Sequence, residues 1–541
     1  MNLDRLGISF LSLAYVMLPS LAFGQVDAVA EVQAAKSGIK AGETDSPQMM
    51  GSSLRNSVSN QKVPVEFDVA GGDNLLWSVP LGSDTYGNPV VANGKVFVGT
   101  NNENGYVERF PSEIDLGVLA CFDEKDGSFL WQHSSQKLEQ GRYFDWPQQG
   151  ICSTPLVDGD RLWFVNNRGE VLCLDTEGFL DGENDGTKDE ENENKDEADV
   201  VWKLDMMKEL GVSQLYMCTC SVTGAGDKIF VSTSNGVSAE GEVKAPEAPS
   251  FLCLDRNTGK VIWKDNSPGG NILHGQWSSP AYAELAGKSQ VIFGAGDGWL
   301  YSFDADGENG QSKLLWKFDC NPKKAEYVHG GGGSRYYIIG TPVIHDGLVF
   351  VGLGEDPEFG EGEGILWCID PSKTGDVSPT IVTNPKYPNG NIPDRRYVAF
   401  KPAEGDVEKE NPNSAEVWRY GGSNLEEFEK TFHLTIGSPA IKDGLLYIAD
   451  FSGVLHCLDA KTGTEHWTYD MFAAAWGSPT IAGEYVYVCD EDGDVAIFEL
   501  SSKNNMLDEL NVEDSVTTSP VVANNRLYIA TRSKLIAIGE K

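Results

Sequence analysis

The stretch PAIKDGLLYIADFSGVLHCLDAKTGTEHW, residues 439–467, decides the fold of this chain. Its proline opens a short apolar segment, and Asp443-Gly444 supplies the positive-φ residues of a two-residue hairpin turn. Residues 445–449 then alternate as a strand does. A third segment ends on Asp459, and Thr-Gly turns the chain into a fourth segment that carries Trp467. The pattern predicts four consecutive antiparallel strands.

The same phrase recurs along the chain. Close copies begin at Pro89, Pro342 and Pro520, and looser ones at Pro155, Pro280 and Pro479, with Val222 where an eighth proline would fall. Pro439, Pro479 and Pro520 are spaced by 40 and 41 residues, the length of one four-stranded propeller blade.

The chain ends indicate how the repeats are arranged. The last copy stops at Ile538 after three strands, and a strand without a partner, residues 75–79, precedes the first copy. Pairing the two would remove exposed strand edges. We therefore expect an all-β, eight-bladed β-propeller of four-stranded antiparallel blades, closed by this N-terminal strand completing the last blade.

Tryptophan recurs on the expected fourth strands, at Trp77, Trp131, Trp202, Trp263, Trp316, Trp418 and Trp467, with Leu510 at the corresponding place in the seventh copy. The phrase small-x-Asp-x-x-Thr-Gly-x-x-x-Trp, as in residues 253–263 and 457–467, resembles the tryptophan-docking motif of PQQ (pyrroloquinoline quinone) repeat propellers. The resemblance covers roughly residues 70–540. It implies that these tryptophans pack one blade against the next, and it says little about function.

The family includes quinoprotein alcohol dehydrogenases and the outer-membrane assembly protein BamB. Long secreted members of planctomycete type, with inserted loops like those of this chain, have no assigned role. In the dehydrogenases PQQ lies on the axis over a tryptophan, against a disulfide of adjacent cysteines, with calcium held by carboxylate and amide oxygens. This sequence has no Cys-Cys pair and no Cys-x-x-Cys-His for an attached haem. We therefore assign no cofactor, with PQQ and calcium as the alternative.

The N-terminal region is expected to lie outside the propeller. Residues 1–24 combine Arg5, an apolar run and small residues before a cleavage site, which is typical of a secretory signal peptide. Residues 25–62 are polar and are predicted to form a disordered tether. The propeller is expected over residues 63–541, and no other stretch is apolar enough for a transmembrane anchor.

Charge narrows the range of partners. The formal net charge of −39 repels nucleic acid and anionic lipid. An acidic insertion at about 176–199 is expected to be a solvated loop, with weak divalent-cation binding as the alternative. A Pro- and Asn-rich insertion at about 371–416 would decorate the fifth blade.

The ten cysteines do not form an obvious disulfide framework. Cys121, Cys173, Cys253, Cys368 and Cys457 occupy one third-strand position in different copies, too far apart for bridges, and are expected to be buried packing residues. A bridge from Cys152 to Cys218 or Cys220 is left open. We assign no metal site, because no second pair with ligand spacing accompanies Cys218-x-Cys220.

Residues just before innermost strands line the central channel of a propeller. Aromatic, imidazole, amide and guanidinium groups fall there, and we predict a ligand site at this axial mouth from Trp146, Gln149, His274, Gln276, Trp277, Arg335, His433 and Trp476. The alternative is that they only satisfy turn and channel backbone.

These features favour a secreted, monomeric, non-catalytic scaffold, periplasmic or extracellular, that binds a protein or envelope polymer. The alternative is a PQQ- and calcium-dependent periplasmic alcohol or sugar dehydrogenase. No catalytic residue can be assigned, and nucleic acid is not expected as a partner.

Overall fold

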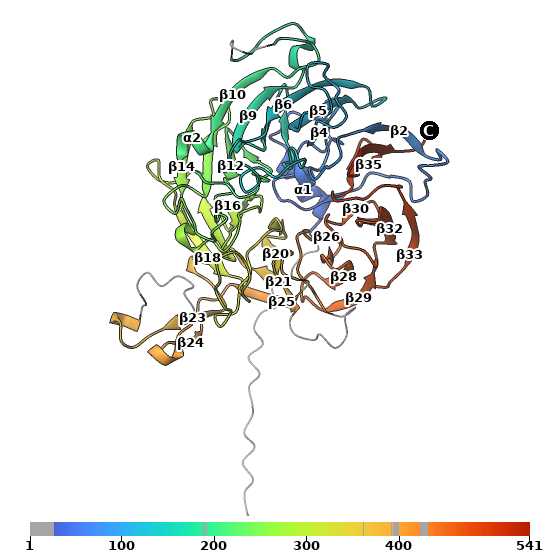
Figure 1. Ribbon diagram of the computed structural model, residues 1–541. Helices are drawn as coiled ribbons and strands as arrows, with labels where there is room; N and C mark the ends of the chain where they lie inside the picture. Colours follow the sequence, from blue (N-terminus) through green and yellow to red (C-terminus); the bar gives the residue numbers. More distant parts are fainter. Residues whose placement is uncertain are drawn as a thin grey trace, which may run out of the picture.

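The computed structural model of the chain describes residues 26–541 apart from 188, 189, 191, 361, 391, 393–399 and 422–430. Its main sheets are eight, each built on four antiparallel strands, and they stand around a common axis (Figure 1). The predicted eight-bladed β-propeller is confirmed. None of the helices in these described ranges is long and apolar enough to cross a membrane.

The blades follow chain order, and each runs from its inner to its outer strand. Blade 1 holds β3 (Val90–Ala92), β4 (Lys95–Asn101), β5 (Leu116–Asp123) and β6 (Phe129–Gln136). Blade 2 holds β7 (Leu156–Asp158), β8 (Arg161–Val165), β9 (Glu170–Asp175) and β10 (Val200–Asp205). Blade 3 holds β11 (Thr223–Ala225), β12 (Lys228–Ser232), β13 (Phe251–Asp255) and β14 (Val261–Asp265). Blade 4 holds β15 (Ala281–Leu285), β16 (Lys288–Gly294), β17 (Trp299–Asp304) and β18 (Leu314–Asp319).

The second half repeats the pattern. Blade 5 holds β19 (Val343–His345), β20 (Leu348–Gly354), β21 (Gly364–Ile369) and β25 (Glu416–Gly421). Blade 6 holds β26 (Ala440–Lys442), β27 (Leu445–Ala449), β28 (Val454–Asp459) and β29 (Glu465–Asp470). Blade 7 holds β30 (Thr480–Ala482), β31 (Tyr485–Cys489), β32 (Asp494–Glu499) and β33 (Met506–Asn511). Blade 8 holds β34 (Val521–Ala523), β35 (Arg526–Ala530), β36 (Lys534–Ile538) and, antiparallel to β36, β2 (Leu75–Pro80).

The tryptophans of the outer strands lie between blades. Each of six sits opposite a small third-strand residue, as Trp131 does opposite Cys121 and Trp77 opposite Ala537. The indole Nε1 of these six donates to a backbone carbonyl of the next blade. Trp316 donates to the Gln290 side chain instead, and Gln290 in turn donates to Pro371 O.

Blade 7 departs from the expected pattern. Asp508, and not Leu510, lies opposite Ile497, the position that faces a tryptophan in the other blades. The bulge beside this position is shared by all eight blades. The apolar contact is supplied by Val63 and Phe67, which lie buried in the cluster that contains Ile497. A segment from the N-terminal side of the chain thus fills the place of the missing tryptophan.

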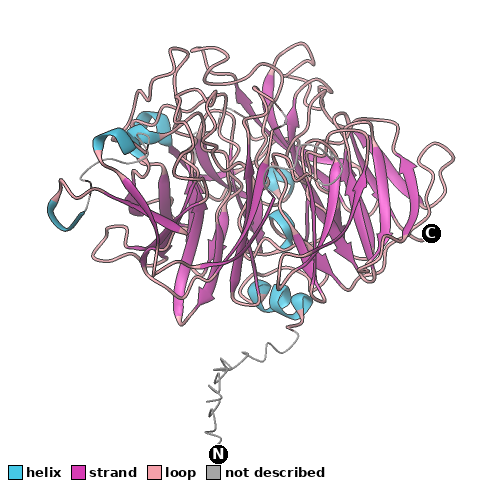
Figure 2. Cartoon of the chain, turned by 90° about the horizontal axis from the view of Figure 1, so that it is seen from below, coloured by secondary structure: helices cyan, strands magenta, loops and turns pink. Residues whose placement is uncertain are grey.

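The prediction of a disordered tether for residues 25–62 is wrong for the residues that the structure describes. Helix α1 (Ala28–Lys36) begins at an Asp27 cap, and the 3-10 turn η1 (Met49–Gly51) and β1 (Val58–Ser59) follow. β1 adds a parallel fifth strand to blade 7 beside β30. The helix lies at the end of the sheets where the described chain begins (Figure 2). We call residues 27–61 the strap.

The strap is held because it hydrogen-bonds to the inner strands or hairpin turns of all eight blades. At least one strap residue bonds to each blade. For blades 1 to 8 these residues include, in order, Ser46, Pro47, Arg55, Ser53, Leu54, Asn56, Ser57 and Thr44. The strap's polar groups are satisfied by the inner edges of the blades, and its apolar residues Ala28, Val29, Val32, Leu54 and Val58 join the main core cluster.

Arg55 is the largest fully buried side chain of the strap, with 0% of its surface exposed. Its Nε donates to Pro280 O at 3.0 Å, Nη1 to Met49 O at 3.0 Å, and Nη2 to Ser221 O and Val222 O, each at 3.1 Å. Burial lowers the pKa of the guanidinium to about 10. Blades 3 and 4 are therefore tied to the strap through one charged side chain.

The described parts of both insertions also carry regular structure. Residues after Pro371 pair with blade 4 through β22 (Gly375–Asp376), parallel to β18, and then form a projecting ribbon of β23 (Thr380–Thr383) and β24 (Val407–Glu410) (Figure 1). The acidic insertion carries η2 (Gly178–Leu180), and its Asp185 lies 2.6 Å from Arg161 Nη2. A short helix, α2 (Met206–Leu210), follows β10.

Candidate functional site

A cavity with a volume of about 340 Å³ lies on the propeller axis. It is lined by the residue that directly precedes the innermost segment in every blade: Asn88, Thr154, Ser221, Ser279, Thr341, Ser438, Ser478 and Ser519. We call these residues the axial ring. Met49 of the strap also lines the cavity. The strap lies at the ends of the first hairpins, so the mouth is at the opposite face.

The axial ring is a belt of hydrogen bonds that passes from blade to blade. Seven of its backbone N–H groups donate to the side-chain oxygen of the next member, at 2.8–3.0 Å. The bond from Ser519 N to Asn88 Oδ1 joins the eighth blade to the first. Each blade thus presents a hydroxyl or amide at one height on the axis.

Aromatic side chains form the wall above the ring. Tyr216 and Trp277 are nearly parallel, with ring centroids 6.0 Å apart and planes 15° apart. Across the mouth, Tyr86 and Trp476 approach to 5.9 Å. Tyr216 holds φ +64, a conformation that costs an L-residue energy and that concentrates at functional sites.

No charged side chain lines this cavity among the described residues. No group of three or more potential metal ligands from His, Cys, Asp and Glu occurs anywhere in the described ranges. PQQ is a tricarboxylate, and calcium needs oxygen ligands that include carboxylates. The residues present therefore do not fit calcium-bound PQQ.

Three of the predicted mouth residues line the cavity: Gln149, Trp277 and Trp476. A fourth, Trp146, packs edge-on against Tyr216 at 5.1 Å and so supports the wall. The structure brings these four together from the loops that enter blades 2, 4 and 7, with Tyr216 from the loop that enters blade 3.

His274 and Gln276 lie behind the wall. His274 is 5% exposed, its Nδ1 lies 2.7 Å from Asp356 Oδ2, and its ring contacts Trp277 edge-on. Gln276 is fully buried and donates to Asn235 O and Ser250 Oγ. Both hold the loop before blade 4 in place, and neither lines the cavity.

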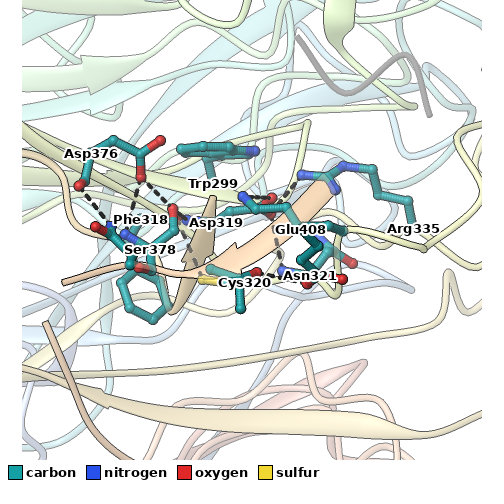
Figure 3. Close-up of polar contacts among 12 residues, drawn as sticks. Trp299, Phe318, Asp319, Cys320, Asn321, Arg335, Asp376, Ser378 and Glu408 are labelled. Atoms are coloured by element: carbon teal, nitrogen blue, oxygen red, sulfur yellow. Dashed lines mark hydrogen bonds and ion pairs between the residues drawn. The ribbon is translucent and has the colours of Figure 1, made fainter. Parts of the chain in front are cut away.

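Arg335 follows the last strand of blade 4 and does not line the cavity; Figure 3 shows it with Asp319 and Trp299 of that blade. It is 2% exposed, its Nη2 contacts Asp319 Oδ1 at 2.6 Å, and its Nε donates to Asp297 O. Lys323 contacts the other Asp319 oxygen at 2.7 Å and lies over the Trp299 ring. Arg335 and Lys323 thus both pair with Asp319 in a structural cluster. The position of Arg335 in a loop before an inner strand does not indicate this pairing.

His433 is also structural. Its Nδ1 lies 2.9 Å from Asp450 Oδ2, and His456 Nε2 lies 3.1 Å from the same oxygen. Burial alone would raise the pKa of Asp450, but the hydrogen bonds from the two histidines outweigh it and hold that pKa at about 2.

Asp490 occupies the same position in blade 7 as Asp450 in blade 6, directly after the second strand. Its Oδ2 is buried without a partner in the described chain. Burial, together with Asp494 and Asp492, raises its pKa from 3.8 to about 6. Its ionised form is therefore destabilising: the penalty grows as pH rises from 3.8 and is complete above about 6.

We expect Asp490→Asn to stabilise the fold by about 1 kcal/mol near pH 8 and to have little effect near pH 4. Asp450→Asn is the matched control with the opposite sign. The low pKa of Asp450 stabilises the fold above its ordinary value of 3.8, and that contribution is lost as pH falls toward 2. Urea unfolding at the two pH values compares the variants: Asp450→Asn should destabilise the fold at both, because both lie above 3.8. Equal effects of Asp490→Asn at the two pH values would contradict the assignment.

All ten cysteines are free. Cys152 lines the cavity, and its Sγ lies 3.4 Å from Met217 Sδ. Burial raises the pKa of the Cys152 thiol to about 12, which makes it a poor nucleophile. Cys218 and Cys220 lie in the neighbouring core, whereas Thr219 between them lines the cavity. The bridge left open by the sequence is not formed.

The sequence analysis missed the axial ring and two wall residues, Tyr86 and Tyr216. A signal for the ring was present, because a Ser, Thr or Asn stands before the opening proline, or Val222, of every copy. Repetition at one register position indicates a shared structural place, which for the first strand of a blade is the axis.

Residues 403–539 match the PQQ-repeat family model described as outer membrane protein assembly factor BamB. This part of the chain carries PQQ repeats. The chain is 22% identical over 346 residues to the outer membrane protein assembly factor BamB of Shewanella oneidensis, which covers 56% of this chain and 79% of that protein.

A second relative is the dehydrogenase subunit of alcohol dehydrogenase (quinone) from Komagataeibacter europaeus. It is 32% identical over 138 residues, which covers 25% of this chain and 17% of that protein. Among solved structures, the quinohemoprotein alcohol dehydrogenase ADHIIG from Pseudomonas putida HK5 superimposes with a TM-score of 0.53 at 13% identity, over 95% of this chain and 82% of that one. At this identity the likeness extends to the fold alone.

Proposed function

We propose that this chain is a non-catalytic binding or assembly scaffold of the cell envelope, exported by residues 1–24 and acting as a monomer. The axial cavity carries the proposal. It is concave, aromatic and uncharged, and it offers hydroxyl and amide groups in place of acid–base or metal-binding groups. Such a site holds a ligand in one orientation, but it provides no group to take up a proton or to hold a metal.

The face that surrounds the mouth supports the same proposal. Exposed apolar side chains stand there on loops, and we call them the apolar crown: Ile114, Tyr143, Val328, Phe359 and Phe472, the last 86% exposed. Each loop joins a second to a third strand or an outer strand to the next blade. In an antiparallel blade these connections lie at one end, which is also the end of the mouth. Exposed apolar groups around a cavity favour a macromolecular partner.

The relatives point to the same cellular compartment. The assembly-factor name of the Shewanella protein supports an envelope protein partner. The quinone-dehydrogenase relative keeps the alternative, a PQQ- and calcium-dependent enzyme, open to direct test. Titration of the chain with PQQ and calcium separates the two: the scaffold binds no quinone, and the dehydrogenase binds it stoichiometrically.

A further inference from the structure

Five hydroxyl groups of the axial ring have no acceptor in the part of the chain that the structure describes. Each oxygen accepts a backbone N–H from the preceding blade, and all five belong to the cavity lining: Thr154, Ser221, Ser279, Ser478 and Ser519. A hydroxyl group also has one proton to donate. The floor of the cavity is therefore a ring of hydrogen-bond donors that a ligand rich in oxygen atoms would satisfy.

The aromatic wall of the same cavity favours a ligand with a flat apolar face. Tyr216, Trp277 and Trp476 are half-buried, so part of each ring faces open space. The strained φ of Tyr216 and its edge-on support by Trp146 and His274 fix its ring beside Trp277. A preorganised aromatic surface loses little conformational freedom when a ligand packs on it.

Charge selects against ionic ligands. The described lining has no ionised side chain to pair with a carboxylate, phosphate or ammonium group. The net charge of −39 further disfavours anions. The ligand that fits is neutral, with an apolar face and a hydroxylated edge.

We propose that the axial cavity binds a neutral sugar unit of an oligosaccharide, an inference that rests on the proposed scaffold function. The two C–H faces of the sugar ring pack on the aromatic side chains, one on Trp277 and the other on Trp476 across the mouth, and its oxygen atoms accept from the axial hydroxyls. The volume of about 340 Å³ is within the range of small-molecule sites. The envelope polymer that the scaffold would hold is thus a neutral glycan, of which the cavity binds one sugar unit.

Calorimetric titration of the chain with cellobiose, maltose, lactose and N,N′-diacetylchitobiose tests this inference. We expect saturable binding of at least one of them with a dissociation constant of about 1 mM or lower. Trp277→Ala should weaken it at least about tenfold, and Trp277→Phe less, with each variant's fold checked by its melting temperature. Leu507→Ala, 42% exposed on the outer strand of blade 7 and outside both the apolar crown and the cavity lining, should leave it unchanged.

No binding of any of these sugars up to about 50 mM would overturn the inference. So would binding that Trp277→Phe and Trp476→Ala both leave unaltered. The PQQ titration distinguishes a failure of the glycan inference from a failure of the scaffold proposal. If neither sugars nor PQQ bind, the glycan inference falls and the scaffold stands, whereas calcium-dependent PQQ binding overturns the scaffold whatever the sugars do.

Discussion

Replacing Arg55 with alanine is expected to lower the free energy of unfolding by about 3–5 kcal/mol. The side chain is fully buried and donates to four backbone carbonyls from the strap, blade 3 and blade 4. Alanine would remove the donor from the Met49, Ser221 and Val222 carbonyls, whereas Pro280 O would keep the Thr223 hydroxyl, and it would also leave a cavity where the guanidinium lay. Chemical unfolding followed by tryptophan fluorescence measures the loss.

Two variants sharpen this test. Arg55→Lys keeps the charge but lacks the forked donors, so it should fall between the wild type and alanine. Arg532→Ala removes an arginine that is 47% exposed and pairs with Asp84, and we expect a loss below about 1 kcal/mol. Equal losses for Arg55→Ala and Arg532→Ala would mean that the strap does not hold the ring together.

Trp263→Ala should cost about 3–5 kcal/mol in the same assay. The side chain is 1% exposed, its Nε1 donates to Ala305 O at 3.1 Å in the next blade, and its ring contacts Phe303. Its removal opens a void in the hydrophobic cluster that joins blades 3 and 4. Trp263→Phe retains most of the packing and removes the hydrogen bond, worth about 1 kcal/mol.

The control is a tryptophan with a different role. Trp476 lines the cavity and is half-buried, and its Nε1 donates to Glu491. Trp476→Ala is expected to change stability by less than about 1 kcal/mol. If Trp476→Ala proved as costly as Trp263→Ala, the division between blade-docking and cavity-lining tryptophans would be wrong.

The propeller could be predicted from the sequence because its determinants are local and repeated. Asp443-Gly444 has the positive φ values that its hairpin requires, 53° and 79°. One such turn is a weak indication, but the same turn at the same place in successive copies fixes strand order and length. Register was less secure in blade 7, where no tryptophan marks the position: Asp508 lies opposite Ile497, where Leu510 was expected.

The strap and the site were harder for a different reason. Composition indicates whether a segment can bury a core of its own, and it says nothing of whether its polar groups can be satisfied on another surface. Arg55 therefore looked like part of a tether. Arg335 and His433 were misassigned for a similar reason. Their loops do lead into inner strands, but their side chains pair with the buried carboxylates of Asp319 and Asp450 and do not enter the cavity.

Calorimetric titration of PQQ into the chain, with and without calcium, tests the central claim most directly. A cavity without charged lining residues should give no binding heat at micromolar protein in either condition, while the chain stays folded by its melting temperature. Stoichiometric, calcium-dependent binding would contradict the claim and would identify the cavity as the cofactor site of a quinoprotein dehydrogenase.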